Sequence, residues 1–200
     1  SPTEWEIRNE PMVKAADGGT LTKLFAGYQM ASKPYTISEY NHTFPNLYLA
    51  EMMPMISAYS AFHGADAIMF FDYNADNDWD TDVVNSFFSI DRNNLLMAAS
   101  PLFAKAFRKG WISEASKSLS IQYSPEDIAL TAKRTGKPWE AGMPFDERLA
   151  LTHKITIQDF DASVTQNPAA RLPEPQSPFQ TTTQQIRWDQ DGLFQVSTPQ

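Results

Sequence analysis

The first half of the chain alternates between two hydrophobic periods, and this alternation limits the fold more than any other feature. Residues 35–38 form a β-branched run typical of a strand. Pro45-Asn46 is then expected to open a helix, which carries apolar side chains at helical spacing over residues 47–62 and ends at Gly64, where glycine suits a left-handed cap. Residues 67–71 are apolar without interruption, which is typical of a strand covered on both faces of a parallel sheet. The order strand, helix, strand predicts a βαβ unit.

Similar patterns flank this unit. Residues 5–7 are a short strand candidate, and Thr20 can cap a helix that continues to Tyr28. Pro54 predicts a kink in the second helix or a late start of it. A third helix runs to Gly110, and its apolar positions are expected on the buried side: Leu95, Leu96, Leu102, Phe103, Ala106 and Phe107. The fold class is therefore α/β over residues 1–112.

After Gly110 the pattern becomes β-rich. Strand-like runs cover residues 119–123, 151–158 and 184–196, and the last of these resembles a hairpin that turns at Asp191-Gly192. A proline-rich stretch without helical periodicity lies before that hairpin. We therefore expect a β-rich, sandwich-like domain over residues 113–200.

Composition excludes several classes of function. The chain has 200 residues, a formal net charge of −8 and 16 basic residues that form no run, which argues against nucleic-acid binding. Cysteine is absent, so disulfides and thiolate sites are excluded. No apolar run approaches the roughly 20 residues of a membrane span. We expect no membrane partner, and the cellular compartment stays open.

Glu39 stands at the end of the first strand of the βαβ unit, where a loop begins. Strand ends are rigid positions from which a carboxylate can act as a nucleophile or as an acid/base. The alternative is structural, because a glutamate at this point can also cap the next helix or pair with a basic side chain.

The tract from Pro34 to His42 resembles the seventh-strand signature of the clan-A glycoside hydrolases, in which a strand of the form Ile-Ser-Glu-Tyr ends in the nucleophilic glutamate. Residues 33–73 are similar to the seventh and eighth barrel strands of bacterial members related to β-galactosidases and agarases. Phe88 to Asp91 and Phe107 to Gly110 look like the segment that leads into the β-domain of these proteins. The resemblance implies the C-terminal βα units of a (β/α)8 barrel followed by a β-rich domain, with Glu39 as nucleophile and with no cofactor.

A complete barrel needs about 250 residues, so these units are either the tail of a larger enzyme or a small open α/β sheet. Glu10, in Asn9-Glu10-Pro11, matches the acid/base signature of the same enzymes. Only 29 residues separate Glu10 from Glu39, however, whereas the fourth and seventh strands need two further βα units between them. Glu10 is therefore a weak acid/base candidate. We expect the acid/base outside this chain, and the chain to be inactive alone.

Further residues are candidates for binding sugar. Asn41 and His42 follow the nucleophile, and either can bond a sugar hydroxyl or serve the loop structure. Asp72 and Tyr73 end the next strand on the same rim, where a tyrosine ring can stack on a sugar face. Trp79 lies in an acidic loop and is either a carbohydrate platform or a buried anchor.

Aspartates alternate around Trp79, at Asp76, Asp78, Asp80 and Asp82. They lack the glycine and the distal glutamate of an EF-hand loop, so we expect no metal site.

The function that these features predict is hydrolysis of a β-linked oligo- or polysaccharide by a retaining mechanism. A non-catalytic carbohydrate-binding or oligomerising module, with Glu39 structural, is the alternative. A compact α/β hydrolase is excluded because no Gly-x-Ser-x-Gly elbow occurs. Unpaired sheet edges at Trp5 and Phe70 predict self-association, or pairing with the remainder of the parent barrel.

Overall fold

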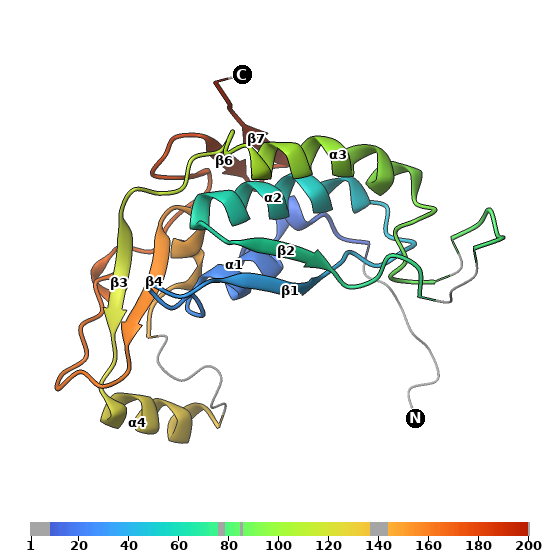
Figure 1. The fold of residues 1–200 in the computed structure, drawn as a ribbon. Helices are drawn as coiled ribbons and strands as arrows, with labels where there is room; N and C mark the ends of the chain where they lie inside the picture. Colours follow the sequence, from blue (N-terminus) through green and yellow to red (C-terminus); the bar gives the residue numbers. More distant parts are fainter. Residues whose placement is uncertain (1–8, 76–78, 85, 137–143, 200) are drawn as a thin grey trace.

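The computed structural model describes residues 9–75, 79–84, 86–136 and 144–199. This part of the chain is a mixed α/β structure with three small sheets, which pair β1 with β2, β3 with β4, and β5 with β6 and β7 (Figure 1). The described strands do not close into a barrel. The strand expected at residues 5–7 lies outside the described residues.

The predicted βαβ unit is present. β1 (Thr36–Tyr40) pairs in parallel with β2 (Ala67–Phe70), and α2 (Met52–His63) connects them. Gly64 ends α2 with a φ of 69°, as its left-handed cap role requires. The helix expected to open at Pro45-Asn46 begins only at Met52, preceded by a 3-10 turn at Leu49–Glu51. Pro54 therefore lies in its first turn, where a missing N–H costs nothing, and the late start is confirmed.

One extra residue in β1 changes which side chains face the solvent. Ile37 pairs with Ile68 and Tyr40 pairs with Phe70, so Ser38 and Glu39 oppose Met69 alone. In a regular strand residues 37 and 39 share a face, and Glu39 would be buried with Ile37. The extra residue instead buries Tyr40 and leaves both Ser38 and Glu39 exposed.

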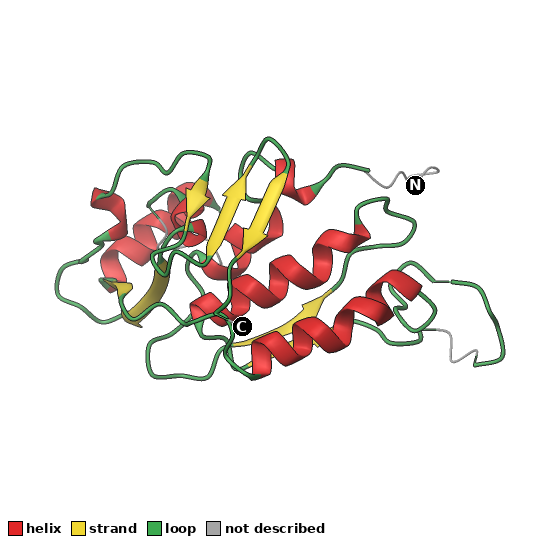
Figure 2. Ribbon diagram, turned by 90° about the horizontal axis from the view of Figure 1, so that it is seen from above, coloured by secondary structure: helices red, strands yellow, loops and turns green. Residues whose placement is uncertain are grey.

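The core surrounds α2, which is buried on nearly all sides. In Figure 1 this helix lies between the β1–β2 pair and a layer made of α3 (Asn94–Arg108), β6 (Ile186–Asp189) and β7 (Leu193–Val196). Figure 2 shows α2 and α3 running side by side. Such a helix is apolar all round, which explains why its hydrophobic residues follow no single stripe.

α3 carries one correction to the sequence analysis. Leu96 and Ala106 are buried as expected, but Leu95 and Leu102 are 48% and 55% exposed. The helix packs against α2 along one narrow face, and the two leucines lie beyond that face.

The second half contains more helix than its sequence suggested. β3 (Ser118–Gln122) pairs in parallel with β4 (Lys154–Asp159), and α4 (Pro125–Thr135) follows β3. The hairpin of β6 and β7 turns at Asp191-Gly192 as predicted, and β5 (Phe179–Gln180) adds a third antiparallel strand. The strands of this half form one parallel pair and one three-stranded antiparallel sheet.

A single hydrophobic core contains residues from both halves of the chain. Trp188 of β6 is fully buried, and its indole N–H donates to the carbonyl of Val13 over 2.6 Å. Ile157 of β4 exchanges backbone hydrogen bonds with Gln29 and Ala31, which precede β1.

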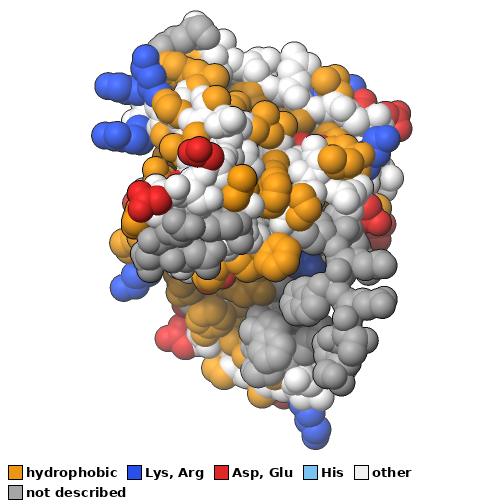
Figure 3. Space-filling view, turned by 90° about the vertical axis from the view of Figure 1, so that its right-hand side faces the viewer, with side chains coloured by type: hydrophobic (Ala, Val, Ile, Leu, Met, Phe, Trp, Pro, Cys, Tyr) orange, Lys and Arg blue, Asp and Glu red, His pale blue; other side chains and the backbone are white. Residues whose placement is uncertain are grey.

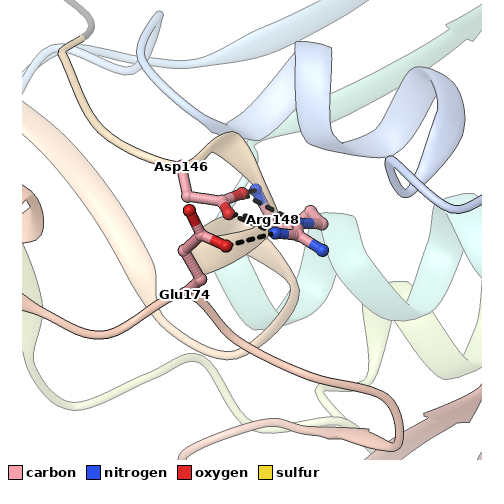
Figure 4. Close-up of polar contacts among 3 residues, drawn as sticks. All are labelled: Asp146, Arg148 and Glu174. Atoms are coloured by element: carbon pink, nitrogen blue, oxygen red, sulfur yellow. Dashed lines mark hydrogen bonds and ion pairs between the residues drawn. The ribbon is translucent and has the colours of Figure 1, made fainter.

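Arg148 joins two irregular segments of the second half. Its guanidinium bonds both carboxylate oxygens of Asp146, at 2.9 Å and 2.5 Å, and it reaches Glu174 of the proline-rich stretch at 3.4 Å (Figure 4). Asp146 also caps the 3-10 turn at Glu147–Leu151 by accepting from the Arg148 N–H. The hydrogen bonds from Arg148 hold the pKa of Asp146 below its usual value.

Candidate functional site

A cavity of about 580 Å³ opens beside the carboxyl end of β1. Its walls are residues 10–15, the start of α1 (Gly19–Phe25), and the loop at 41–51 that leads to α2. Three of the residues predicted from the sequence, Glu10, Asn41 and His42, line it. Its volume is that of an ordinary small-molecule site.

Two side chains hold the walls of the cavity together. The Glu51 carboxylate accepts a hydrogen bond from the backbone N–H of Met12 over 2.6 Å, and Asn9 accepts one from the N–H of Leu47 over 3.0 Å. Burial raises the pKa of Glu51, and its backbone hydrogen bonds oppose that change. Glu51 thereby fixes the segment that carries Glu10 against the loop that follows β1.

His42 is an uncharged group of the cavity. Its Nε2 lies 3.0 Å from the hydroxyl of Tyr40, and burial lowers its pKa to about 4. Burial also raises the pKa of Tyr40. Both rings are therefore neutral near pH 7, and they can exchange hydrogen bonds with neutral hydroxyl groups without attracting an ion.

Asn41 offers an unused acceptor. Its Nδ2 donates to the carbonyl of Phe88 over 2.5 Å, while its Oδ1 is buried and has no hydrogen-bond partner among the described residues. Buried polar atoms are nearly always satisfied. A small turn of the side chain would be needed before a ligand hydroxyl in the cavity could reach this one.

Glu39 lies at the carboxyl end of β1 but is not among the residues that line this cavity. Its side chain is exposed, and no described residue forms a hydrogen bond or an ion pair with it. The residue that precedes α2 as its cap is Glu51, not Glu39.

The rim beyond β2 carries the remaining candidates. Asp72 is half-buried, whereas Tyr73 and Trp79 are 52% and 64% exposed. Their rings lie 6.2 Å apart and are tilted by 31°. Trp79 is thus an exposed ring and not a buried anchor.

Among the cavity residues that the sequence analysis does not single out are Asn46, Tyr48 and Glu51. The sequence pattern places them inside a helix that opens at Pro45-Asn46. Asn46 instead accepts from the N–H of Tyr48 over 2.7 Å, a local turn that asparagine favours. The preference of asparagine for such a turn is the sequence signal that indicates a loop at this point.

The described residues were also compared with the requirements of a metal site and of a membrane-spanning helix. They contain no group of three or more His, Asp or Glu side chains that could hold a metal ion. Asp76 and Asp78 of the alternating aspartates lie outside the described residues. None of the described helices combines the length and the hydrophobicity that crossing a membrane requires.

Comparison with family models, with curated proteins and with solved structures finds no match for this chain. The site must therefore be judged from its own chemistry. It combines a hydrogen-bonding cavity beside the neutral rings of His42 and Tyr40, an exposed carboxylate at a strand end and a pair of exposed aromatic rings. These three features suit a ligand that presents both hydroxyl groups and apolar faces.

Proposed function

We propose that the chain is the nucleophile-bearing part of a retaining glycoside hydrolase that acts on β-linked oligo- or polysaccharide. The observation that carries the proposal is the state of Glu39. It ends a strand of a parallel pair, and the extra residue in β1 turns it out of the core. It lacks any described partner that a structural role would require. Bulges of this kind are frequent beside active sites, where they aim a side chain.

In the proposed reaction the Glu39 carboxylate attacks the anomeric carbon as the bond to the leaving oxygen breaks. A second carboxyl group protonates that oxygen, and water later opens the glycosyl-enzyme. Retaining enzymes hold the two carboxyl groups about 5 to 5.5 Å apart. Glu10 faces the neighbouring cavity, and we propose that the acid/base lies outside this chain, in the remainder of a barrel.

The experiment uses the longest reading frame that contains this chain, with an activated aryl β-glycoside as substrate. Glu39→Gly should abolish turnover, and added azide should restore it by attacking the anomeric carbon directly, giving an α-glycosyl azide. The matched control is Glu10→Gly, which should keep most of its turnover and should gain nothing from azide. Undiminished turnover by the Glu39 variant would end the proposal.

A non-catalytic sugar-binding module is the second candidate, and the cavity beside β1 favours it. The unsatisfied Oδ1 of Asn41 and the neutral His42 line this cavity, and neither needs a reacting partner to bind a hydroxyl. For this candidate, Asn41→Ala should weaken sugar binding, and no variant of Glu39 should change any turnover.

A further inference from the structure

We propose that four exposed rings, those of Phe71, Tyr73, Trp79 and Phe88, form a binding surface for a neutral polysaccharide chain. We call these four residues the aromatic surface. This proposal rests on the proposed function for the class of ligand, because the catalytic site and the aromatic surface would both bind carbohydrate. It adds that the ligand is a chain of several sugars without negative charge.

The four rings form two pairs that remain open to solvent. Phe71 and Phe88 are 49% and 38% exposed, with centroids 5.0 Å apart in an edge-to-face arrangement. Tyr73 and Trp79 form the second, more exposed pair. Figure 3 shows hydrophobic side chains gathered on the face from which the loop after β2 projects, with charged side chains mostly around its edge. Exposed aromatic groups of this extent mark interaction sites.

The backbone beneath the rings is fixed by hydrogen bonds. The carbonyl of Tyr73 accepts from the N–H groups of Ile90 and Asp91, at 3.2 Å and 3.1 Å. The N–H of Ala75 donates to the hydroxyl of Ser89 over 2.9 Å. The backbone at Tyr73 is therefore held to the segment that follows Phe88 before any ligand arrives, which lowers the entropic cost of binding there.

This surface adjoins the loop that follows Glu39. The N–H of Phe44 donates to the carbonyl of Phe87 over 2.8 Å, next to the contact between Asn41 and Phe88. A chain lying on the rings would continue toward the end of β1.

The number of rings selects a chain over a single sugar. The ring centroids within the two pairs lie 5.0 Å and 6.2 Å apart, so one sugar ring can cover one pair. Neighbouring sugars of a chain can cover both pairs at once. Affinity should therefore rise from a monosaccharide to short oligosaccharides.

Charge selects a neutral chain. Asp72, Asp80 and Asp82 lie close to Tyr73 and Trp79 in the sequence, in a protein whose net charge is −8. Carboxylates accept hydrogen bonds from sugar hydroxyls, whereas they repel uronate or sulfate groups. This complementarity separates a neutral glycan from an anionic one, and also from an anionic lipid surface.

The test is native electrophoresis of the 200-residue chain in gels that contain a soluble polysaccharide. The neutral probes are mixed-linkage β-glucan, hydroxyethyl cellulose and galactomannan, and the anionic probe is alginate. We expect at least one neutral gel to slow the chain and the alginate gel not to. Trp79→Ala and Phe88→Ala should each reduce this retardation at least fivefold. Phe160→Ala, which removes a ring 43% exposed at another place, should leave it unchanged.

Several results would overturn the proposal. They are the absence of retardation in every neutral gel, equal retardation by alginate, or full retardation of the Trp79 and Phe88 variants. A concentration-dependent dimer that Trp79→Ala abolishes, without any effect of sugar, would identify a second copy of the chain as the occupant. Glu39→Gln should retain the retardation, because the rings do not need the carboxylate. If azide restores the turnover of the Glu39→Gly enzyme while no neutral gel slows the chain, the proposed function stands and only the aromatic surface is wrong.

Discussion

The two sides of the β1–β2 pair differ in what surrounds them. On the side toward α2, Ile37 and Tyr40 are buried in a core that extends to Trp188, near the other end of the chain. On the opposite side, Ser38, Glu39 and Met69 are exposed. The first side stabilises the fold, and the second carries side chains that take no part in the described core. This division teaches that the second side is available for a ligand or a partner.

The largest effect should come from Trp188, on the core side. Trp188→Ala removes a fully buried ring and leaves the carbonyl of Val13 without its donor, so we expect the free energy of unfolding to fall by about 3–5 kcal/mol. Trp79→Ala removes an exposed ring and should change it by less than about 0.5 kcal/mol. Urea denaturation followed by circular dichroism measures both. Equal losses of unfolding free energy in the two variants would contradict the division into a core side and an open side.

A smaller effect should appear as a pH dependence that also belongs to the core side. Burial lowers the pKa of His63 to about 3, and the neutral ring stacks on Phe25 at 4.3 Å while its Nε2 bonds the carbonyl of Ala150. The unfolded chain therefore takes up this proton first. Stability is fully present above about pH 6.5 and falls by about 1.4 kcal/mol per pH unit below it, until the folded pKa is reached.

His63→Gln retains a donor for Ala150 but does not titrate. Its urea midpoint should therefore fall less steeply between pH 6.5 and pH 4.5 than that of the parent chain. A slope remains in the variant, because burial also lowers the pKa of His42 and of His153. Parallel curves for variant and parent would mean that His63 is not the buried titrating group.

The smallest effect on stability should come from Glu39, on the open side. Glu39→Gln removes a charge that no described residue contacts, and the free energy of unfolding should change by less than about 0.5 kcal/mol. Asp146→Asn is the matched change at a partnered carboxylate, where the loss of a charged cap and ion pair should cost about 1 kcal/mol. Thermal unfolding of the two variants compares them directly. A destabilisation by Glu39→Gln as large as that by Asp146→Asn would show that Glu39 is structural.

The local signals of the first half predicted its elements well. The β-branched run, the uninterrupted apolar run and Gly64 place β1, β2 and the end of α2 close to where they are found. Each of these signals acts over a few residues and does not depend on tertiary contacts. The helix α4 could have been found in the same way, since Ser124 caps it and Pro125 opens it.

The features that needed tertiary structure could not be predicted. Trp188 meets Val13 across 175 residues, and no pattern in the sequence records that contact. The exposure of Leu95 and Leu102 depends on how much of α3 its neighbours cover. Three candidates, Glu10, Asn41 and His42, line one cavity, but the sequence did not predict that Glu39 lies outside it. The sequence did not predict that Asn46 and Glu51 line the cavity, because its apolar spacing indicates a helix where the structure has a loop.

The extra residue in β1 decides which of two neighbouring side chains meets water. If all four residues from Ile37 to Tyr40 paired regularly, the phenol would turn to the outside and the acid would be forced toward α2. Removing Ser38 would instead straighten the strand and keep the acid outside and the phenol inside. The orientation of the acid therefore depends on the irregular pairing and not on the serine itself.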